Sequence, residues 1–289
     1  YITIILSEIL KKIAFYPKSL TLPMRKFIAK GFDYTGLHKV IPYEIRLNYD
    51  LVTRPWYGYS IFHAAKIAKA LNYKSVSILE FGVAGGNGLV NIERHIEEIK
   101  KIIDIEFEVY GFDLETGLPP PKDKKDLSYH WQEGFFKMEK NELEKKLKFS
   151  KLVLGDVKKT CPEFIAKYKP APIGCVFVDL DYYSSTVDAL KTFDGPDDFF
   201  LPRLLCYFDD TLGSEDELYN EFSGELAAIN DFNSTHENKK LSNLRCLYER
   251  KFKAGWNEMM YSYHNFTHKD YNKHISTTPK QQPLSKIHQ

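Results

Sequence analysis

The chain has 289 residues, which is enough to bury a sizeable core, and we expect one large α/β domain with additions rather than two small domains. Lysine and arginine (40) nearly balance aspartate and glutamate (39), so the net charge of +1 provides no overall field that attracts nucleic acid or an anionic membrane. The four cysteines lack metal-ligand spacing and favour a reducing compartment. We therefore expect a cytoplasmic protein with no nucleic-acid partner.

Residues 1–53 are predicted to form a helical cap in front of the main domain. Apolar residues recur at helical spacing over residues 1–15, a stretch too short to span a bilayer. This helix is expected to pack on the domain or on a second subunit, which leaves a homo-oligomer through the N-terminal region open, and a membrane-surface anchor is the alternative. Neither a signal-peptide cleavage pattern nor a transmembrane segment is expected.

A predicted helix over residues 56–71 precedes the first strand of the main domain. That strand, residues 77–81, leads into a turn with four glycines, and a second helix follows over residues 87–101. Glycine allows positive φ angles and lets the backbone come close to a ligand. A strand, a glycine turn and a helix start therefore predict a bound small molecule.

Several known motifs can be compared with this turn, EFGVAGGNG at residues 80–88. A P-loop is excluded, because the last glycine is not followed by Lys and then Ser or Thr. The dinucleotide fingerprint GxGxxG is weakened, since Ala84 stands where its second glycine belongs. Glu80, Gly82, Ala84 and Gly86 together resemble motif I of class I S-adenosylmethionine-dependent methyltransferases. A plain tight turn between strand and helix is the alternative.

The next two predicted strands also end in acids. Residues 105–112 lead to Asp113, which is placed to bind ribose hydroxyls, because ligands bind beyond the carboxyl ends of the strands in an open parallel sheet. Residues 114–136 form a long loop that predicts either a substrate lid or a surface loop stabilised by its aromatics. A strand over residues 151–154 then leads to Asp156, which is placed to accept a hydrogen bond from an adenine amino group. Capping a turn or a helix is the alternative for both acids.

Four carboxylates follow the next two predicted strands. Residues 173–178 lead to Asp179 and Asp181, and the strand after them leads to Asp209 and Asp210. Residues two apart on a strand point to the same side, so Asp179 and Asp181 are expected to converge. Buried like charges are costly unless a cation or a shared proton relieves them, and hard cations prefer oxygen ligands. The pattern predicts a metal site, with helix caps and solvated turn acids as the alternative.

The C-terminal part is predicted to complete the sheet. A helix is expected over residues 215–232, with Leu218 and Phe222 on its apolar side, followed by strands over residues 243–253 and 258–263. Strands that alternate with helices, followed by such a final pair, predict an α/β fold. We expect a Rossmann-like, mainly parallel seven-stranded sheet with helices on both faces and an antiparallel C-terminal edge hairpin.

Five segments together resemble the macrocin O-methyltransferase family: residues 80–88, 110–119, 154–162, 177–186 and 207–210 (EFGVAGGNG, YGFDLETGLP, LGDVKKTCP, FVDLDYYSST and YFDD). That family consists of class I, metal-dependent enzymes that methylate sugar hydroxyls of natural products, with relatives in bacterial surface-glycan clusters. The resemblance covers about residues 54–263 and implies a methyltransferase domain over residues 54–270. The polar composition from Tyr271 onward predicts a flexible tail over residues 271–289.

The resemblance also implies a role for each motif residue. S-adenosyl-L-methionine and Mg²⁺ are the implied cofactors, and a small molecule or glycan is the implied acceptor. Glu80, Gly82 and Gly86, together with the loop residue Ala84, would hold the methionine portion of the cofactor. Asp113 would hold its ribose, and Asp156 would hold its adenine. Asp179, Asp209 and Asp210 would bind Mg²⁺, and Asp181 would act as general base beside Asp179. The family often ends its glycine loop in Arg-Gly-Gly-Ser, where this chain has Ala-Gly-Gly-Asn.

The chemistry of methyl transfer agrees with these roles. An alcohol is a poor nucleophile, and a metal lowers the pKa of a bound oxygen while a nearby carboxylate takes the proton. The predicted function is therefore Mg-assisted O-methylation of a hydroxyl on a sugar, glycan or natural-product acceptor. The alternatives are an NAD(P)-dependent oxidoreductase that uses the looser GxGxxG pattern, and a non-catalytic relative that binds S-adenosylmethionine.

Overall fold

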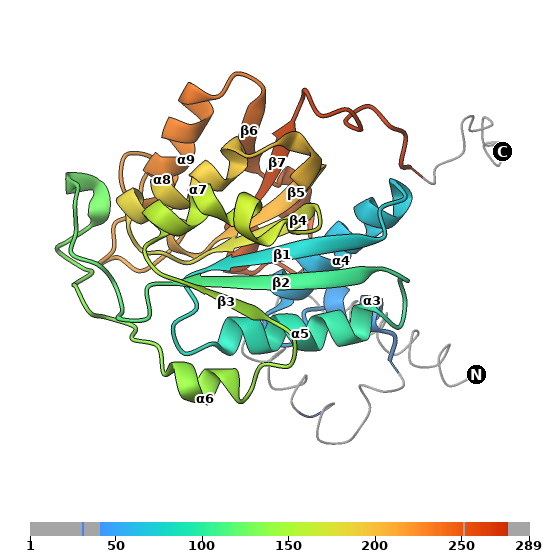
Figure 1. Ribbon diagram of the computed structural model, residues 1–289, viewed down its shortest axis with the longest axis horizontal. Helices are drawn as coiled ribbons and strands as arrows, with labels where there is room; N and C mark the ends of the chain where they lie inside the picture. Colours follow the sequence, from blue (N-terminus) through green and yellow to red (C-terminus); the bar gives the residue numbers. More distant parts are fainter. Residues whose placement is uncertain (1–30, 32–40, 251, 277–289) are drawn as a thin grey trace, which may run out of the picture.

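The computed structural model describes residues 31, 41–250 and 252–276, and they contain a seven-stranded sheet of order β3-β2-β1-β4-β5-β7-β6 (Figure 1). The strands are β1 (Ser75–Phe81), β2 (Glu106–Asp113), β3 (Lys151–Leu154), β4 (Ile173–Val178), β5 (Phe200–Phe208), β6 (Lys239–Asn243) and β7 (Met260–Asn265). Strands β1 to β5 are parallel, and β7 runs antiparallel to both β5 and β6. The predicted fold class, including the antiparallel edge pair, is confirmed.

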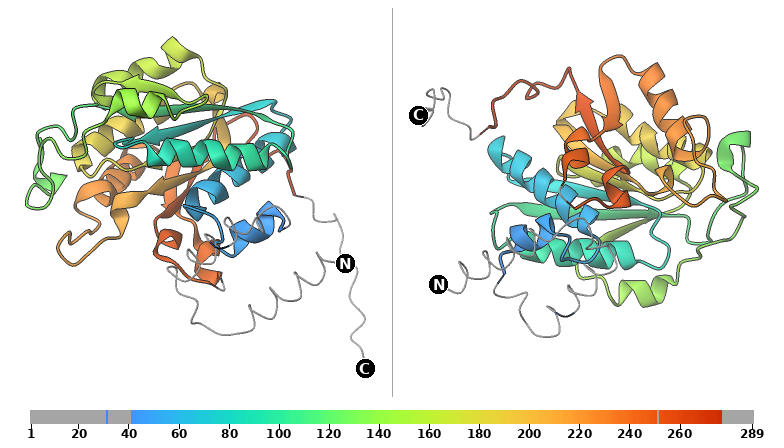
Figure 2. Two further views of the ribbon diagram at one scale, coloured as in Figure 1. Left: turned by 90° about the horizontal axis from the view of Figure 1, so that it is seen from below. Right: turned by 180° about the vertical axis from the view of Figure 1, so that it is seen from behind.

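Helices cover both faces of the sheet. One face carries α3 (Tyr43–Asn48), α4 (Pro55–Ala70) and α5 (Asn87–Ile99), and the other carries α7 (Val157–Tyr168), α8 (Tyr183–Leu190) and α9 (Gly224–Thr235). Seen from behind in Figure 2, α3 and α4 lie beside α5. The short α6 (Lys140–Glu144) precedes β3, and the 3₁₀ helices are η2 (Lys124–Asp126), η3 (Lys191–Asp194), η4 (Asp197–Phe199), η5 (Asp209–Thr211), η6 (Arg245–Glu249) and η7 (Gly255–Asn257).

The central strands are buried on both faces. Every residue of β4, and every residue of β1 except the first, is buried. Along β1, Ile78 packs into the core under α4 and α5, whereas Leu79 packs into the core under α7 to α9. Parallel strands covered on both faces require continuous apolar sequence. This requirement explains why β4 was recognisable as an apolar run and why the first acid after it marks the edge of the sheet.

The predicted helix over residues 215–232 is wrong in its first half. α9 begins well after residue 215, and Leu218 and Phe222, which the prediction placed on an apolar face, are 65% and 80% exposed. Leu218 has a φ angle of 52°, which no α-helix accommodates. The segment is held instead by tertiary contacts, such as the hydrogen bond of 2.7 Å from the Tyr129 hydroxyl to the Glu217 carbonyl. Contacts with distant residues therefore outweigh the local helical periodicity.

The first strand of the predicted C-terminal hairpin lies earlier in the chain than expected. Residues 243–253 were predicted to form it, but β6 ends at Asn243. The last pair of β6 joins Asn243 to Tyr261, at the start of β7, so in the described part of the chain the following residues have no strand to pair with. They fold into η6, which buries Leu247. The length of β7 that is available for pairing, rather than the local sequence, sets where β6 ends.

Much of the predicted N-terminal cap and C-terminal tail lies outside the described residues. Of residues 1–53 the structure describes residue 31 and residues 41–53, which include α3. The predicted helix over residues 1–15 and an oligomer formed through it therefore stay predictions. Within the described ranges, no helix is both long and apolar enough to cross a membrane. The four cysteines are all free.

Gly82 illustrates how closely the ends of β1 and β4 approach each other. It has a φ angle of +86°, and a Cβ at this position would lie 1.8 Å from the backbone oxygen of Asp179. We expect Gly82→Ala to lower the free energy of unfolding by at least about 2 kcal/mol, through the clash and the strained φ angle. Urea denaturation measures the change. Gly85→Ala is the matched control, because a Cβ there meets nothing within 4 Å; equal stability of both variants would contradict the close approach.

Candidate active site

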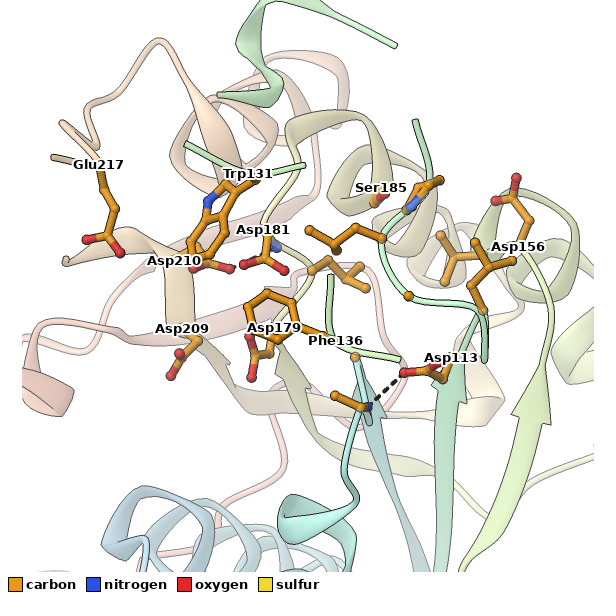
Figure 3. A pocket seen from close by; sticks show the side chains of 18 of the residues that line it. Asp113, Trp131, Phe136, Asp156, Asp179, Asp181, Ser185, Asp209, Asp210 and Glu217 are labelled. Atoms are coloured by element: carbon orange, nitrogen blue, oxygen red, sulfur yellow. Dashed lines mark hydrogen bonds between the residues drawn. The ribbon is translucent and has the colours of Figure 1, made fainter. Parts of the chain in front are cut away.

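A cavity of about 370 Å³ opens at the carboxyl edge of the parallel strands (Figure 3). Its wall takes residues from the ends of five strands: Gly82 after β1, Asp113 on β2, Asp156 after β3, Asp179 after β4 and Asp209 after β5. The volume is that of a small-molecule site, and the position is where open α/β sheets bind ligands. The cavity therefore joins the predicted cofactor loop and the predicted metal ligands in one site.

Asp113 holds the glycine turn in place from the neighbouring strand. Its Oδ2 accepts hydrogen bonds from the backbone N–H groups of Val83 (2.9 Å) and Ala84 (2.8 Å), and its Oδ1 accepts one from Glu115 (2.6 Å). Ala84 has a φ angle of +44°, a left-handed conformation that these contacts stabilise. Asp113 thus acts as a turn cap, the alternative that the sequence left open. It also lines the cavity, and Oδ1, which accepts a single hydrogen bond, retains a lone pair for a ligand.

Two of the six predicted cofactor residues, Glu80 and Gly86, lie outside the cavity wall. The Glu80 carboxylate is buried and accepts a hydrogen bond of 2.5 Å from the Tyr57 hydroxyl. A Cβ on Gly88 would lie 1.7 Å from Glu80 Oε1, and a Cβ on Gly86 would lie 2.0 Å from Leu143 Cδ1. Glu80 and Gly86 therefore contribute to the packing of the turn on its side away from the cavity. In the present structure they pack the turn and do not face the space that a ligand would occupy.

Asp156 takes the helix-cap role that the sequence left open, and its adenine-binding role stays a prediction. Its side chain caps α7 by accepting a hydrogen bond of 2.9 Å from the backbone N–H of Lys158. The same residue lines the cavity at the end of β3, with Asp113 on the adjacent strand. The helix cap orients the carboxylate, and its remaining lone pairs are available to a ligand.

Three carboxylates meet at the other end of the cavity, and we call Asp179, Asp181 and Asp210 the acid trio. One oxygen from each lies within 4.8 Å of the other two. The convergence of Asp179 with Asp181 is as expected, but the reason given for it was wrong. Both residues lie beyond the end of β4, and Asp181 has a φ angle of +60°, so turn geometry rather than strand alternation brings them together.

Asp209 lines the same cavity, but it lies outside the acid trio (Figure 3). Its Oδ1 accepts a hydrogen bond of 2.7 Å from the Tyr207 hydroxyl. The predicted ligand set of Asp179, Asp209 and Asp210 stays a prediction, and the geometry adds Asp181 as a fourth oxygen donor within reach.

The acid trio is electrostatically unfavourable without a counter-charge. Burial, together with repulsion from neighbouring carboxylates, raises the pKa of Asp181 to about 9 and that of Asp210 to about 7. The same two causes raise the pKa of Asp179 well above its ordinary value. A bound cation would remove the repulsion and favour the ionised forms. A donor set made only of carboxylate oxygens fits a hard cation such as Mg²⁺.

Two surface segments cover the cavity. From the long loop over residues 114–136, Trp131 and Phe136 line it, and from the segment before α9, Glu217 and Tyr219 line it. The loop is anchored to the fold by a buried carboxylate: Asp126 accepts hydrogen bonds from the backbone N–H (2.7 Å) and the hydroxyl (2.9 Å) of Ser184. The predicted lid loop therefore does border the site, while its predicted motion stays a prediction.

Two residues that contact the acid trio were missed by the sequence analysis. The Tyr219 hydroxyl donates a hydrogen bond of 2.8 Å to Asp210 Oδ1, and the buried Glu225 carboxylate accepts one of 3.1 Å from the Asp210 N–H. Tyr219 lies in the half of the predicted helix that is wrong, and Glu225 lies in the half that forms α9. The available signal was Ser223, a residue type that favours helix N-caps, directly before Gly224 and the apolar run of α9.

The buried Glu80 predicts a pH dependence of stability. Burial raises the pKa of Glu80 from 4.5 to about 7. A folded-state pKa above the unfolded value favours the neutral form, so stability present below pH 4.5 is lost as the pH rises through 7, by roughly 3 kcal/mol in total. We expect Glu80→Gln to be more stable than wild type by about this amount at pH 8 and equally stable at pH 4.5, as measured by urea denaturation.

Glu93, a buried acid that lies on α5, is the control for this comparison. Although burial opposes it, hydrogen bonds from the backbone N–H of Phe149 and from Ser150 lower the pKa of Glu93. Glu93→Gln should therefore lose stability at pH 8, with the opposite sign to Glu80→Gln. A constant difference in stability between Glu80→Gln and wild type across this pH range would contradict the assignment.

No family model matches the sequence, and no curated protein matches it. Among solved structures, the calicheamicin methyltransferase CalS11 is similar with a TM-score of 0.52 and 20% identity, over 75% of this chain and 82% of that chain. The O-methyltransferase NovP aligns with a TM-score of 0.47 and 14% identity, over 72% of this chain and 78% of that chain. The likeness to CalS11, together with the strand order, shows that the chain has the fold of class I S-adenosylmethionine-dependent methyltransferases.

Proposed function

We propose that the protein is an S-adenosylmethionine-dependent, Mg²⁺-assisted O-methyltransferase that acts on a hydroxyl of a sugar, glycan or natural-product acceptor. The observation that carries the proposal is that one cavity contains both the glycine turn after β1 and the acid trio after β4 and β5. The fold shared with the methyltransferase CalS11 and the motif resemblance to the macrocin O-methyltransferases support it.

The end of the cavity at β1, β2 and β3 fits the cofactor. Gly82 and Ala84 expose backbone rather than large side chains, which leaves room beside the turn for the methionine portion. Asp113 and Asp156 lie at the ends of adjacent strands and keep free lone pairs for the ribose and the adenine amino group. Glu80 and Gly86 contribute to the same subsite by holding the turn from behind.

The end of the cavity at β4 and β5 fits the reaction. Asp179, Asp209 and Asp210 are the proposed ligands of Mg²⁺, and Asp181 is the proposed acceptor of the hydroxyl proton. When bound, Mg²⁺ would lower the pKa of the acceptor hydroxyl, and S-adenosylmethionine would supply the methyl group. Asp181 lies beside the other acids, so an acceptor oxygen bound to them would lie within hydrogen-bond reach of Asp181, which would take its proton.

The remaining residues orient the reactants and exclude water. Methyl transfer is an in-line displacement, so much of the rate depends on holding the acceptor oxygen in line with the cofactor's methyl group. Trp131 and Phe136 form part of the cavity wall contributed by the long loop and would exclude solvent from it. No covalent protein nucleophile is needed for this reaction.

Calorimetry with S-adenosylmethionine, NAD and NADP tests the cofactor class. We expect S-adenosylmethionine to bind and both nicotinamide dinucleotides to give no heat, because Ala84 replaces the second glycine of the dinucleotide fingerprint. A cofactor-turnover assay with a panel of sugar and glycan acceptors then tests catalysis, with loss of turnover in EDTA and recovery on adding Mg²⁺. Absence of S-adenosylmethionine binding would overturn the proposal, and turnover that survives EDTA would remove the metal from it.

Asp181→Asn tests the proton acceptor. The amide keeps the shape of the side chain but takes up no proton, so we expect the dissociation constant of S-adenosylmethionine to change less than about twofold while turnover falls by a factor of about 10² or more. Asp188→Asn is the matched control, since Asp188 is a buried acid on α8 that pairs with Lys191 away from the cavity wall. Unchanged turnover in Asp181→Asn would exclude Asp181 from this role.

A further inference from the structure

The carboxylate of Glu225 joins the two turns that carry the acid trio. Glu225 lies in the first turn of α9 and is fully buried. Its Oε1 accepts a hydrogen bond of 3.3 Å from the backbone N–H of Leu180, between Asp179 and Asp181. Its Oε2 accepts one of 3.1 Å from the backbone N–H of Asp210. One side chain therefore bridges the turn after β4 and the turn after β5.

These turns need such a bridge, because the sheet does not determine their conformation. The paired residues of β4 and β5 end at Val178 and Phe208, so no strand register fixes the residues beyond. Asp181 has a left-handed φ angle, and Asp210 departs from helical geometry within η5. Residues in such conformations persist only where their surroundings hold them.

Burial of the Glu225 carboxylate beside other acids is energetically costly. A buried carboxylate beside other buried carboxylates suffers both loss of hydration and repulsion. Two backbone N–H bonds offset part of this cost, and a neighbouring cation would offset much of the rest. An apolar residue at the start of α9 would avoid the repulsion but would leave the N–H groups of Leu180 and Asp210 without this acceptor.

We propose that Glu225 is a positioning residue that sets the spacing of the acid trio and thereby the affinity of the site for a divalent cation. This inference rests on the proposed function, since it assumes that Asp179 and Asp210 of the acid trio help to hold a metal ion. Glu225 itself does not line the cavity and acts through the backbone of Leu180 and Asp210.

Glu225→Gln is the direct test. Glutamine has nearly the same shape but only one acceptor oxygen, so its NH₂ group must face one of the two backbone N–H donors and release that turn. We expect the affinity for Mn²⁺, an oxygen-preferring probe for the Mg²⁺ site, to fall at least tenfold by calorimetry and by electron paramagnetic resonance. S-adenosylmethionine affinity should change less than about twofold, because Glu225 does not contact the glycine turn.

Glu225→Asp keeps both acceptor oxygens on a shorter side chain. We expect it to lose less Mn²⁺ affinity than Glu225→Gln, and it carries the test if the glutamine variant fails to fold. In that case a measurable loss of Mn²⁺ affinity in the folded aspartate variant supports the proposal, and wild-type affinity overturns it.

Glu93→Gln is the matched control, because Glu93 is also a buried carboxylate that accepts backbone N–H bonds, from residues 148–150 far from the cavity wall. It should lose stability yet keep wild-type Mn²⁺ affinity; an equal loss of Mn²⁺ affinity in this control would overturn the positioning role. Wild-type Mn²⁺ affinity in folded Glu225→Gln would overturn the inference alone. A wild-type protein that binds no Mn²⁺ would overturn the proposed metal site, and the inference with it.

Discussion

Buried carboxylates that accept hydrogen bonds from backbone N–H groups hold the loops of this protein at the carboxyl edge of its sheet. Asp113 binds the glycine turn after β1, Asp126 binds the start of α8, and Glu225 binds the turns after β4 and β5. A carboxyl group has two acceptor oxygens and can accept hydrogen bonds from several N–H groups at once. Each acid thus fixes a turn or loop that borders the cavity.

The cavity has two chemically different ends. At β1 to β3 the wall consists of glycine-turn backbone and of acids whose charges are already partly neutralised by N–H groups. At β4 and β5 the acids face one another, and burial with mutual repulsion raises their pKa values. The first end suits a neutral, hydrogen-bonding nucleoside, and the second suits a cation. In the proposed reaction, the methyl donor therefore lies at the first end of the cavity and the activated hydroxyl lies at the second end.

The two segments that cover the cavity contact each other. The loop after β2 and the segment before α9 are joined by the hydrogen bond from Tyr129 to the Glu217 carbonyl. Each carries a large apolar residue that is partly exposed at the cavity wall, Phe136 on the loop and Leu212 on the segment. The part of the cavity wall that these two segments contribute is therefore partly apolar.

The sequence by itself determined the succession of strands and helices from β1 to β5, the carboxyl ends of these five strands and the acids that follow or end them. Apolar runs such as residues 173–178 predict strands buried on both faces, and the first acids after such strands are expected at the edge of the sheet. Glycine spacing and acid pairs then located the site and suggested its chemistry. These features are local, because hydrophobic periodicity and backbone freedom are properties of neighbouring residues.

Only the tertiary structure decided which side chains meet. Glu80 packs behind the turn rather than in the cavity because the Tyr57 hydroxyl, on a preceding helix, reaches it there. Residues 215–223 leave the helical conformation because they bind Asp210 and the long loop, and Asp181 joins the acid trio through a left-handed turn held from α9. Such conformations depend on hydrogen bonds between residues far apart in the chain, whose energies exceed the small local preferences of each segment.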